Sequence, residues 1–233
     1  MRPQLFVLHH AGGNSYSFKF LEPYLASFTV VCPELPGRGR RIREPLLSDF
    51  DLAAQDIYKQ IIGKLDACPF FIYGHSMGGY LALRVCNLLE RAGKLPGYII
   101  VSGNAGPGLI FPRLRYLLTG AALKEELRRL GGVPDEVLDD EELFDFFEPI
   151  LRADFEVAER HGLAWEPPMK APIFAIMGDQ EEKVLDIANW ERFTLGGLTT
   201  EVVDGDHFFI HKHAERLAAI IRHCHDKITL LQA

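Results

Sequence analysis

Short apolar segments recur along the 233-residue chain, and segments with a helix-like pattern separate them. Most of the short segments are apolar throughout, which is typical of strands that are buried on both faces of a parallel sheet. Strands are predicted at residues 5–9, 28–32, 70–73, 98–101, 173–177 and 200–203. Helices are predicted at residues 50–67, 77–92, 186–194 and 211–227. Because strands and helices alternate, the sequence predicts the α/β class, with a mostly parallel central sheet flanked by helices.

One long segment interrupts this alternation. Residues 103–170 contain no strand pattern, but they have helical patterns at 114–118, 123–130 and 142–160. We expect an insertion at about residues 104–170 that forms a helical lid over a substrate site, and a structural cap without a gating role is the alternative. No repeat or linker marks a second unit, so residues 1–233 are expected to form one domain.

Composition fits an ordinary globular domain, with 48% hydrophobic and 24% charged residues. No apolar run is long enough to span a membrane, and the first apolar segment is too short for a signal peptide. The net charge of −7 disfavours nucleic acid as a partner. The four cysteines have no C-x-x-C spacing, so we expect reduced thiols of a cytoplasmic protein. They are Cys32, Cys68, Cys86 and Cys224.

A candidate nucleophile lies between a predicted strand and a predicted helix. Residues 74–78 read G-H-S-M-G, and the pattern G-x-S-x-G in this context is typical of a nucleophile elbow. Small residues on both sides let the chain turn sharply while the serine hydroxyl stays exposed. The sequence therefore predicts that Ser76 is a catalytic nucleophile, with a plain glycine turn as the alternative.

The candidate base is one of nine histidines. Hydrolases with this elbow place the serine first, then the acid, then the histidine, which excludes His9, His10 and His75. His207 follows the last predicted strand, and active sites gather in loops at the carboxyl ends of such strands. The remaining histidines fall in helix-like segments and are expected at the surface: His161, His211, His213, His223 and His225. Their spacing matches no metal-ligand motif, so no metal is expected.

The candidate acid should lie in the loop that follows the predicted strand 173–177. This loop contains Asp179 and Glu181, either of which could orient the histidine. Asp206 is a weaker alternative because neighbours in sequence rarely present their side chains to each other. Asn104 follows another strand but carries no charge.

Several motifs together resemble one family, the type II (external, editing) thioesterases of polyketide and nonribosomal peptide synthesis. The motifs are H-A-G-G at 10–13, P-E-L-P-G-R-G at 33–39, G-H-S-M-G-G at 74–79, L-G-G-V-P at 130–134, L-R-A-D-F at 151–155, Trp190 and G-D-H-F-F at 205–209. Because the resemblance extends over the whole chain, it implies an α/β-hydrolase fold with a helical lid.

The loop of the candidate acid departs from the family pattern. The family usually shows G-D-x-D there, and the second aspartate is the triad acid. In this chain Asp179 has the first position and Glu181 has the second. Glutamate can orient the histidine in such triads, so the resemblance favours Glu181 over Asp179.

The resemblance also implies the chemistry and the partner. Ser76 would attack an acyl thioester with His207 as base, and the backbone N–H groups of Met77 and Ala11 would form the oxyanion hole. The thioester would be carried on the phosphopantetheine arm of an acyl or peptidyl carrier protein, and the enzyme would remove stalled or aberrant acyl groups. No cofactor, nucleic acid or membrane is implied, and we expect a monomer.

Arginines cluster after the second predicted strand. Arg38, Arg40 and Arg41 could contact an acidic carrier protein or a phosphate, and structural contacts of these arginines are the alternative. Asp154, in the L-R-A-D-F motif, is expected to pair with a cation or to cap a turn.

Two other functions are compatible with this sequence. A carboxylesterase or a related hydrolase of small oxygen esters would need the same triad. A ligand-binding protein of this fold without catalysis would keep the cavity but would not depend on Ser76.

Overall fold

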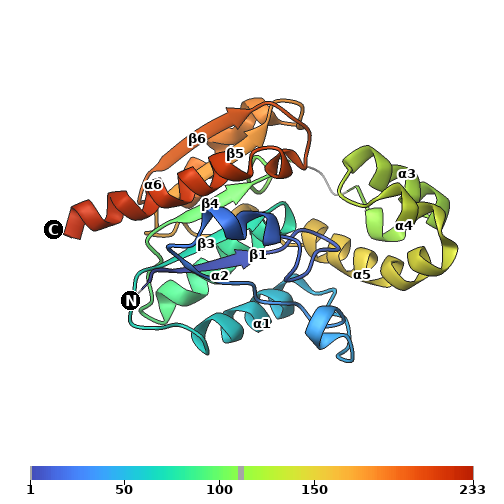
Figure 1. The fold of residues 1–233 in the computed structure, drawn as a ribbon, viewed down its shortest axis with the longest axis horizontal. Coiled ribbons are helices and arrows are strands. Elements are labelled where there is room, and N and C mark those ends of the chain that lie inside the picture. The colour runs from blue at the N-terminus through green and yellow to red at the C-terminus, as the bar shows by residue number, and fades with distance from the viewer. Residues whose placement is uncertain (1, 110–112, 233) are drawn as a thin grey trace.

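The computed structural model describes residues 2–109 and 113–232, and a six-stranded parallel sheet forms its centre (Figure 1). The strands are β1 (Gln4–Leu8), β2 (Thr29–Val31), β3 (Phe70–His75), β4 (Ile99–Ser102), β5 (Ile173–Gly178) and β6 (Leu198–Val203). Their order in the sheet is β2-β1-β3-β4-β5-β6, and every neighbouring pair is parallel. The predicted fold class is confirmed, and the strand ends differ from the predicted ones by at most two residues.

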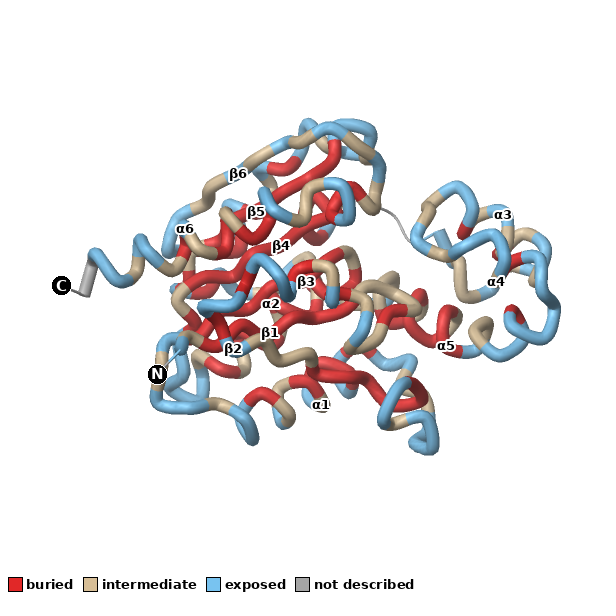
Figure 2. The backbone as a smooth tube through the Cα atoms, in the orientation of Figure 1, coloured by how far each residue is buried: buried red, intermediate tan, exposed pale blue. Residues whose placement is uncertain are grey.

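Helices cover both faces of the sheet, and alternate residues of the strands pack against them. On one face, Phe70 and Ile72 pack with α1 (Phe50–Ile62) and α2 (Met77–Arg91). On the other face, Phe71 and Tyr73 pack with α6 (Ala214–Gln232) and the 3-10 turn η1 (Lys19–Tyr24). Figure 2 shows the result, because the central strands are buried while the outer sides of the helices are exposed.

Three helix predictions need correction at their ends or in their type. The helix predicted at 50–67 ends at Ile62, where Gly63 turns the chain and its N–H bonds to the carbonyl of Lys59. The segment predicted at 186–194 is the 3-10 helix η5 (Val184–Phe193). The last helix begins at Ala214, after a separate 3-10 turn, η6 (Phe209–His211).

The chain between β4 and β5 forms a helical insertion that stands beside the sheet (Figure 1). Its elements are η3 (Arg115–Leu117), α3 (Gly120–Leu130), α4 (Asp135–Asp139), α5 (Glu141–Glu159) and η4 (Leu163–Trp165). Leu123, Leu127 and Phe144 belong to a small hydrophobic core of its own, and α5 contacts α1 and α2. The insertion therefore has an apolar cluster of its own, and α5 anchors it on α1 and α2.

Two further observations concern helix length and hydropathy, and the cysteine thiols. Within residues 2–109 and 113–232, no helix is both long and apolar enough to cross a membrane. The four cysteines are unpaired, and burial raises the pKa of Cys32 and Cys224 to about 12. These two thiols therefore stay protonated near neutral pH.

Candidate active site

Ser76 occupies the sharp turn between β3 and α2. Its backbone has φ 54° and ψ −117°, a conformation that costs a residue with a side chain about 1–3 kcal/mol. The glycines on either side leave room for this turn. A Cβ at Gly74 would collide with the carbonyl of Gly78, and a Cβ at Gly78 would collide with the carbonyl of Leu8. The backbone thus has the geometry of an elbow, with the serine at its tip.

The imidazole of His207 lies between the serine and a carboxylate. Its Nε2 is 3.0 Å from Ser76 Oγ, and its Nδ1 is 2.8 Å from Glu181 Oε2. The other oxygen of Glu181 accepts the backbone N–H of Gly178 at 3.0 Å, and the Glu181 side chain is 5% exposed. In this arrangement Nδ1–H donates to the carboxylate, and Nε2 is positioned to accept the serine proton.

Asp179, in the same loop as Glu181, contacts backbone and not the imidazole. Its Oδ1 accepts the backbone N–H of Gly205 at 2.8 Å, so it links the loop after β5 to the loop that carries His207. Asp206 accepts the backbone N–H of Phe208 through its Oδ1. The structure therefore places Glu181 against His207, whereas Asp179 and Asp206 accept hydrogen bonds from backbone N–H groups.

Asn104 supports the elbow from the end of β4. Its side-chain amide donates to the carbonyl of Ser76 at 2.9 Å, and its Oδ1 accepts the N–H of Gly106. The sequence did not indicate this role. Asn104 lies where an acid was considered, and its neutral amide suits the bond to a backbone carbonyl.

The loop at residues 10–13 is held against the site by a buried ion pair. Asp154 accepts the N–H of Gly12 at 2.7 Å and pairs in bidentate fashion with Arg38 at 2.5 and 2.7 Å. The two side chains are only 0% and 3% exposed, and Arg38 also donates to the carbonyl of Gly13. Asp154 thus pairs with a cation, as expected, and fixes the loop that contains Ala11.

Removing this charge is expected to destabilise the fold. Asp154→Asn leaves the Arg38 guanidinium buried without its carboxylate, so we expect the free energy of unfolding to fall by about 3–5 kcal/mol. Chemical denaturation monitored by circular dichroism measures the change. Asp135→Asn, at an exposed position of the insertion, is the matched control and should change stability by less than about 0.5 kcal/mol. A loss below about 1 kcal/mol in Asp154→Asn would contradict this account of the pair.

The arginines that were expected to dock a partner are only partly available. The prediction is wrong for Arg38, because its side chain is buried and paired with Asp154. Arg41 bonds to both Glu44 and Asp56 and to a backbone carbonyl, so its guanidinium is already engaged. Arg40 is exposed, and among the described residues its side chain has no ion-pair partner.

Three other histidines near Ser76 have lowered pKa values. Burial lowers the pKa of His9 and His10 to about 4, and it holds the pKa of His75 well below its usual range. Nδ1 of His75 lies 2.8 Å from Ser102 Oγ, and its ring centre is 5.1 Å from that of His207. These imidazoles therefore stay neutral near the site.

His161 was expected at the surface, and that prediction is wrong. Its ring packs on Tyr80, with ring centres 4.4 Å apart, and it lines the cavity at the serine. Burial lowers its pKa to about 4, so it contributes a neutral wall.

A cavity of about 340 Å³ opens at the serine. Ser76, Met77, His207 and Ala11 line it on the side of the sheet. The helical insertion supplies most of the apolar wall, which consists of Leu127, Leu130, Val133, Val137, Phe147, Leu151 and Phe155. The insertion therefore shapes the space in front of Ser76.

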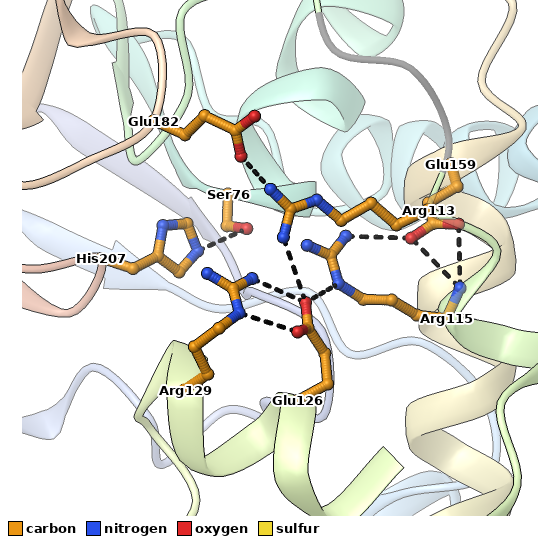
Figure 3. Close-up of polar contacts among 8 residues, drawn as sticks. All are labelled: Ser76, Arg113, Arg115, Glu126, Arg129, Glu159, Glu182 and His207. Atoms are coloured by element: carbon orange, nitrogen blue, oxygen red, sulfur yellow. Dashed lines mark hydrogen bonds and ion pairs between the residues drawn. The ribbon is translucent and has the colours of Figure 1, made fainter. Parts of the chain in front are cut away.

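Charged side chains of the insertion also reach this cavity, which the sequence did not indicate. Figure 3 shows Arg113, Arg115 and Arg129 gathered around Glu126 near Ser76 and His207. Glu159 and Glu182 complete the group through Arg115 and Arg113. Charges spaced along amphipathic helices are typical of a solvated face, so only the folded chain reveals this cluster.

Comparison with known proteins agrees with this geometry. A family model described as "Thioesterase domain" matches residues 3–228. Linear gramicidin dehydrogenase LgrE of Brevibacillus parabrevis is 32% identical, over 93% of this chain and 85% of that protein. Thioesterase PikA5 of Streptomyces venezuelae is also 32% identical, over 89% of this chain and 75% of that protein.

Solved structures give the same result. The type II thioesterase BorB from the borrelidin biosynthetic cluster superposes with a TM-score of 0.88 at 30% identity, covering 96% of this chain and 93% of that one. The resemblance to type II thioesterases drawn from the motifs is thereby confirmed, together with the fold that it implied.

Proposed function

Since the chain belongs to the thioesterase domain family and is a thioesterase, we propose that it releases acyl groups from the phosphopantetheine arm of carrier proteins in polyketide or nonribosomal peptide synthesis. The observation that carries the proposal is the line of hydrogen bonds from Ser76 through His207 to Glu181 at the wall of the cavity. The relatives from such biosynthetic systems support the pathway class.

The catalytic roles follow from this line. Ser76 Oγ attacks the thioester carbonyl carbon while His207 Nε2 takes its proton, and Glu181 stabilises the imidazolium that forms. The carbon–sulfur bond then breaks, and His207 gives the proton to the leaving thiolate. In the second half, water loses a proton to His207 and attacks the acyl carbon, and Ser76 Oγ takes the proton back as it leaves.

The oxyanion of each tetrahedral intermediate needs hydrogen-bond donors in fixed positions. We assign this role to the backbone N–H groups of Met77, in the first turn of α2, and of Ala11. The Arg38–Asp154 pair supports the assignment, because it holds the loop of Ala11 in place. Arg38 and Asp154 are thus positioning residues for the oxyanion hole.

One relative is named a dehydrogenase, and this name does not extend to the present chain. Dehydrogenases of the dinucleotide-binding type carry G-x-G-x-x-G between a strand and a helix. The chain contains no such segment, and its strand–turn–helix glycines serve the serine elbow.

The carrier protein is proposed to approach over the exposed Arg40. An acidic carrier surface would be attracted to this guanidinium, whereas Arg38 and Arg41 are already paired within the protein.

A substrate panel tests this function. One acyl group is offered on a carrier protein, on N-acetylcysteamine and as the matching oxygen ester. We expect kcat/KM to be highest on the carrier protein and lowest for the oxygen ester.

Arg40→Glu should lower kcat/KM on the carrier protein about threefold to tenfold, because the charge of a residue that contacts the carrier protein changes sign.

The small thioester is the internal control of this panel, since it has no carrier surface to meet Arg40. Lys94→Glu, at an exposed position after α2, is the matched variant and should leave all three rates unchanged. Faster hydrolysis of the oxygen ester than of both thioesters would contradict the proposed function. An unchanged rate of Arg40→Glu on the carrier protein would contradict the docking part alone.

A further inference from the structure

Three guanidinium groups line the cavity that an acyl chain would enter. Arg113, Arg115 and Arg129 belong to the helical insertion, and they share the cavity lining with Ser76 and His207 (Figure 3). Guanidinium groups in a cavity wall do not favour binding of a hydrocarbon chain, because charged groups need polar or charged partners. The cluster therefore bears on which acyl groups the enzyme selects.

Glu126 is the centre of the cluster. Arg129 donates to its two oxygens at 2.8 and 2.7 Å, Arg115 donates at 2.7 Å, and Arg113 lies 3.6 Å away. Hydrogen bonds from Arg129 and Arg115 lower the pKa of Glu126 to about 2, so it stays ionised. One carboxylate thus faces three cations.

A second carboxylate is fixed on the inner side of the cluster. Glu159, which is 6% exposed, accepts from the Nη1 of Arg115 at 2.9 Å and from its backbone N–H at 3.2 Å. Arg115 is thereby held on both sides and is only 16% exposed. It is the least accessible of the three arginines.

The third carboxylate, Glu182, forms the most exposed ion pair of the cluster. Glu182 pairs with Arg113 on the outer side, where the two side chains are 55% and 34% exposed. Exposed pairs of this kind contribute little to stability and open readily. The remaining carboxylate of the lining, Glu181, is bound to His207 and to the N–H of Gly178. Without Glu182, three guanidiniums therefore face two carboxylates, and the cluster has one positive charge in excess.

We propose that Arg113 and Arg129 form an anion-binding subsite in the acyl cavity, where an anionic group of the substrate takes the place of Glu182. This inference rests on the proposed thioesterase function. The planar guanidinium presents paired N–H donors that match a carboxylate or a phosphate. The anion can come from two sources: a carboxylate on the acyl group, or the phosphate of the phosphopantetheine arm.

Two pairs of thioesters distinguish the sources. Succinyl- and butyryl-N-acetylcysteamine differ in the terminal carboxylate, and butyryl-phosphopantetheine and butyryl-pantetheine differ in the phosphate. For the pair whose anion binds, Arg113→Gln and Arg129→Gln should each lower the ratio of kcat/KM, anionic over neutral, by about tenfold. Glu182→Gln should raise the same ratio, because it removes the competing carboxylate.

Arg128→Gln is the matched control on α3. Arg128 pairs with Asp135 and Asp139, and it does not line the cavity, so this variant should keep both the ratio and the basal rate of the wild type. Ratios that stay unchanged in both pairs for both Arg113→Gln and Arg129→Gln would overturn the subsite. A lower ratio in Glu182→Gln would overturn it as well.

Binding measurements separate this inference from the proposed function. Calorimetry on Ser76→Ala gives the Kd of each thioester without turnover. In this background, Arg113→Gln and Arg129→Gln should each weaken binding of the anionic thioester relative to the neutral one by about tenfold. If the wild type fails to hydrolyse the neutral thioesters, the proposed function fails, while the Kd ratios still decide the subsite. If the neutral thioesters are hydrolysed and the Kd ratios do not respond to Arg113→Gln or Arg129→Gln, the subsite alone is wrong.

Discussion

Replacing Ser76 with alanine is expected to lower kcat/KM for an acyl thioester by about 10⁴-fold or more. In the proposed mechanism the hydroxyl attacks the carbonyl carbon, and among the described residues it is the hydroxyl that lies 3.0 Å from His207 Nε2. Most of the loss should appear in kcat, because the cavity that binds the acyl group is unchanged. Release of the free thiol, followed with a thiol-reactive dye, measures both constants.

Ser27→Ala is the matched control for this substitution. Ser27 is exposed and does not line the cavity, so its variant should have wild-type rates. Wild-type function in Ser76→Ala would instead support a ligand-binding protein that uses the fold without catalysis.

Replacing Glu181 with glutamine is expected to lower kcat by about 10³–10⁴-fold. The amide of glutamine can present an N–H₂ group to Nδ1 of His207, which favours the tautomer with the proton on Nε2. In that tautomer the imidazole cannot accept the serine proton. Neutral glutamine also fails to stabilise the imidazolium. Steady-state kinetics on the same thioester measures the effect, with KM expected to change little.

Asp179→Asn is the matched variant with which the kcat of Glu181→Gln is compared. Asp179 is exposed and does not touch the imidazole, and asparagine keeps the Oδ1 acceptor for the N–H of Gly205. The variant should therefore lose less than about 1 kcal/mol of stability, and its loss of kcat should be much smaller than that of Glu181→Gln. A larger loss of kcat in Asp179→Asn than in Glu181→Gln would show that the acid has been assigned wrongly.

Much of the fold could be predicted from the sequence because most of the strands are short and apolar throughout, and helix-like segments separate them outside residues 103–170. Ser76 and His207 could also be selected as candidates, since each lies in a local motif that follows a strand, and the structure brings the two side chains to 3.0 Å. The choice between Asp179 and Glu181 was harder. The two differ by two positions in one loop, and only the folded loop shows which carboxylate turns towards His207.

The errors concern residues whose partners are distant in the sequence. Arg38 was considered both for a contact with a partner and for a structural contact, and the structure shows the second, because its partner Asp154, 116 positions away, forms a buried pair with it. Arg113 and Glu182 are 69 positions apart, so spacing alone could not bring them to one cavity. Such pairs are set by the packing of the insertion on the sheet, which local patterns do not report.

The most direct test of the account is to locate the acyl group during turnover. An acyl-carrier protein is mixed with the enzyme, the reaction is quenched in acid within milliseconds, and the peptides are identified by mass spectrometry. The account predicts an acyl ester on Ser76 in the wild type and in Glu181→Gln, and none in Ser76→Ala. Discharge of the carrier protein with the acyl group on another residue, or at an unchanged rate in Ser76→Ala, would contradict it.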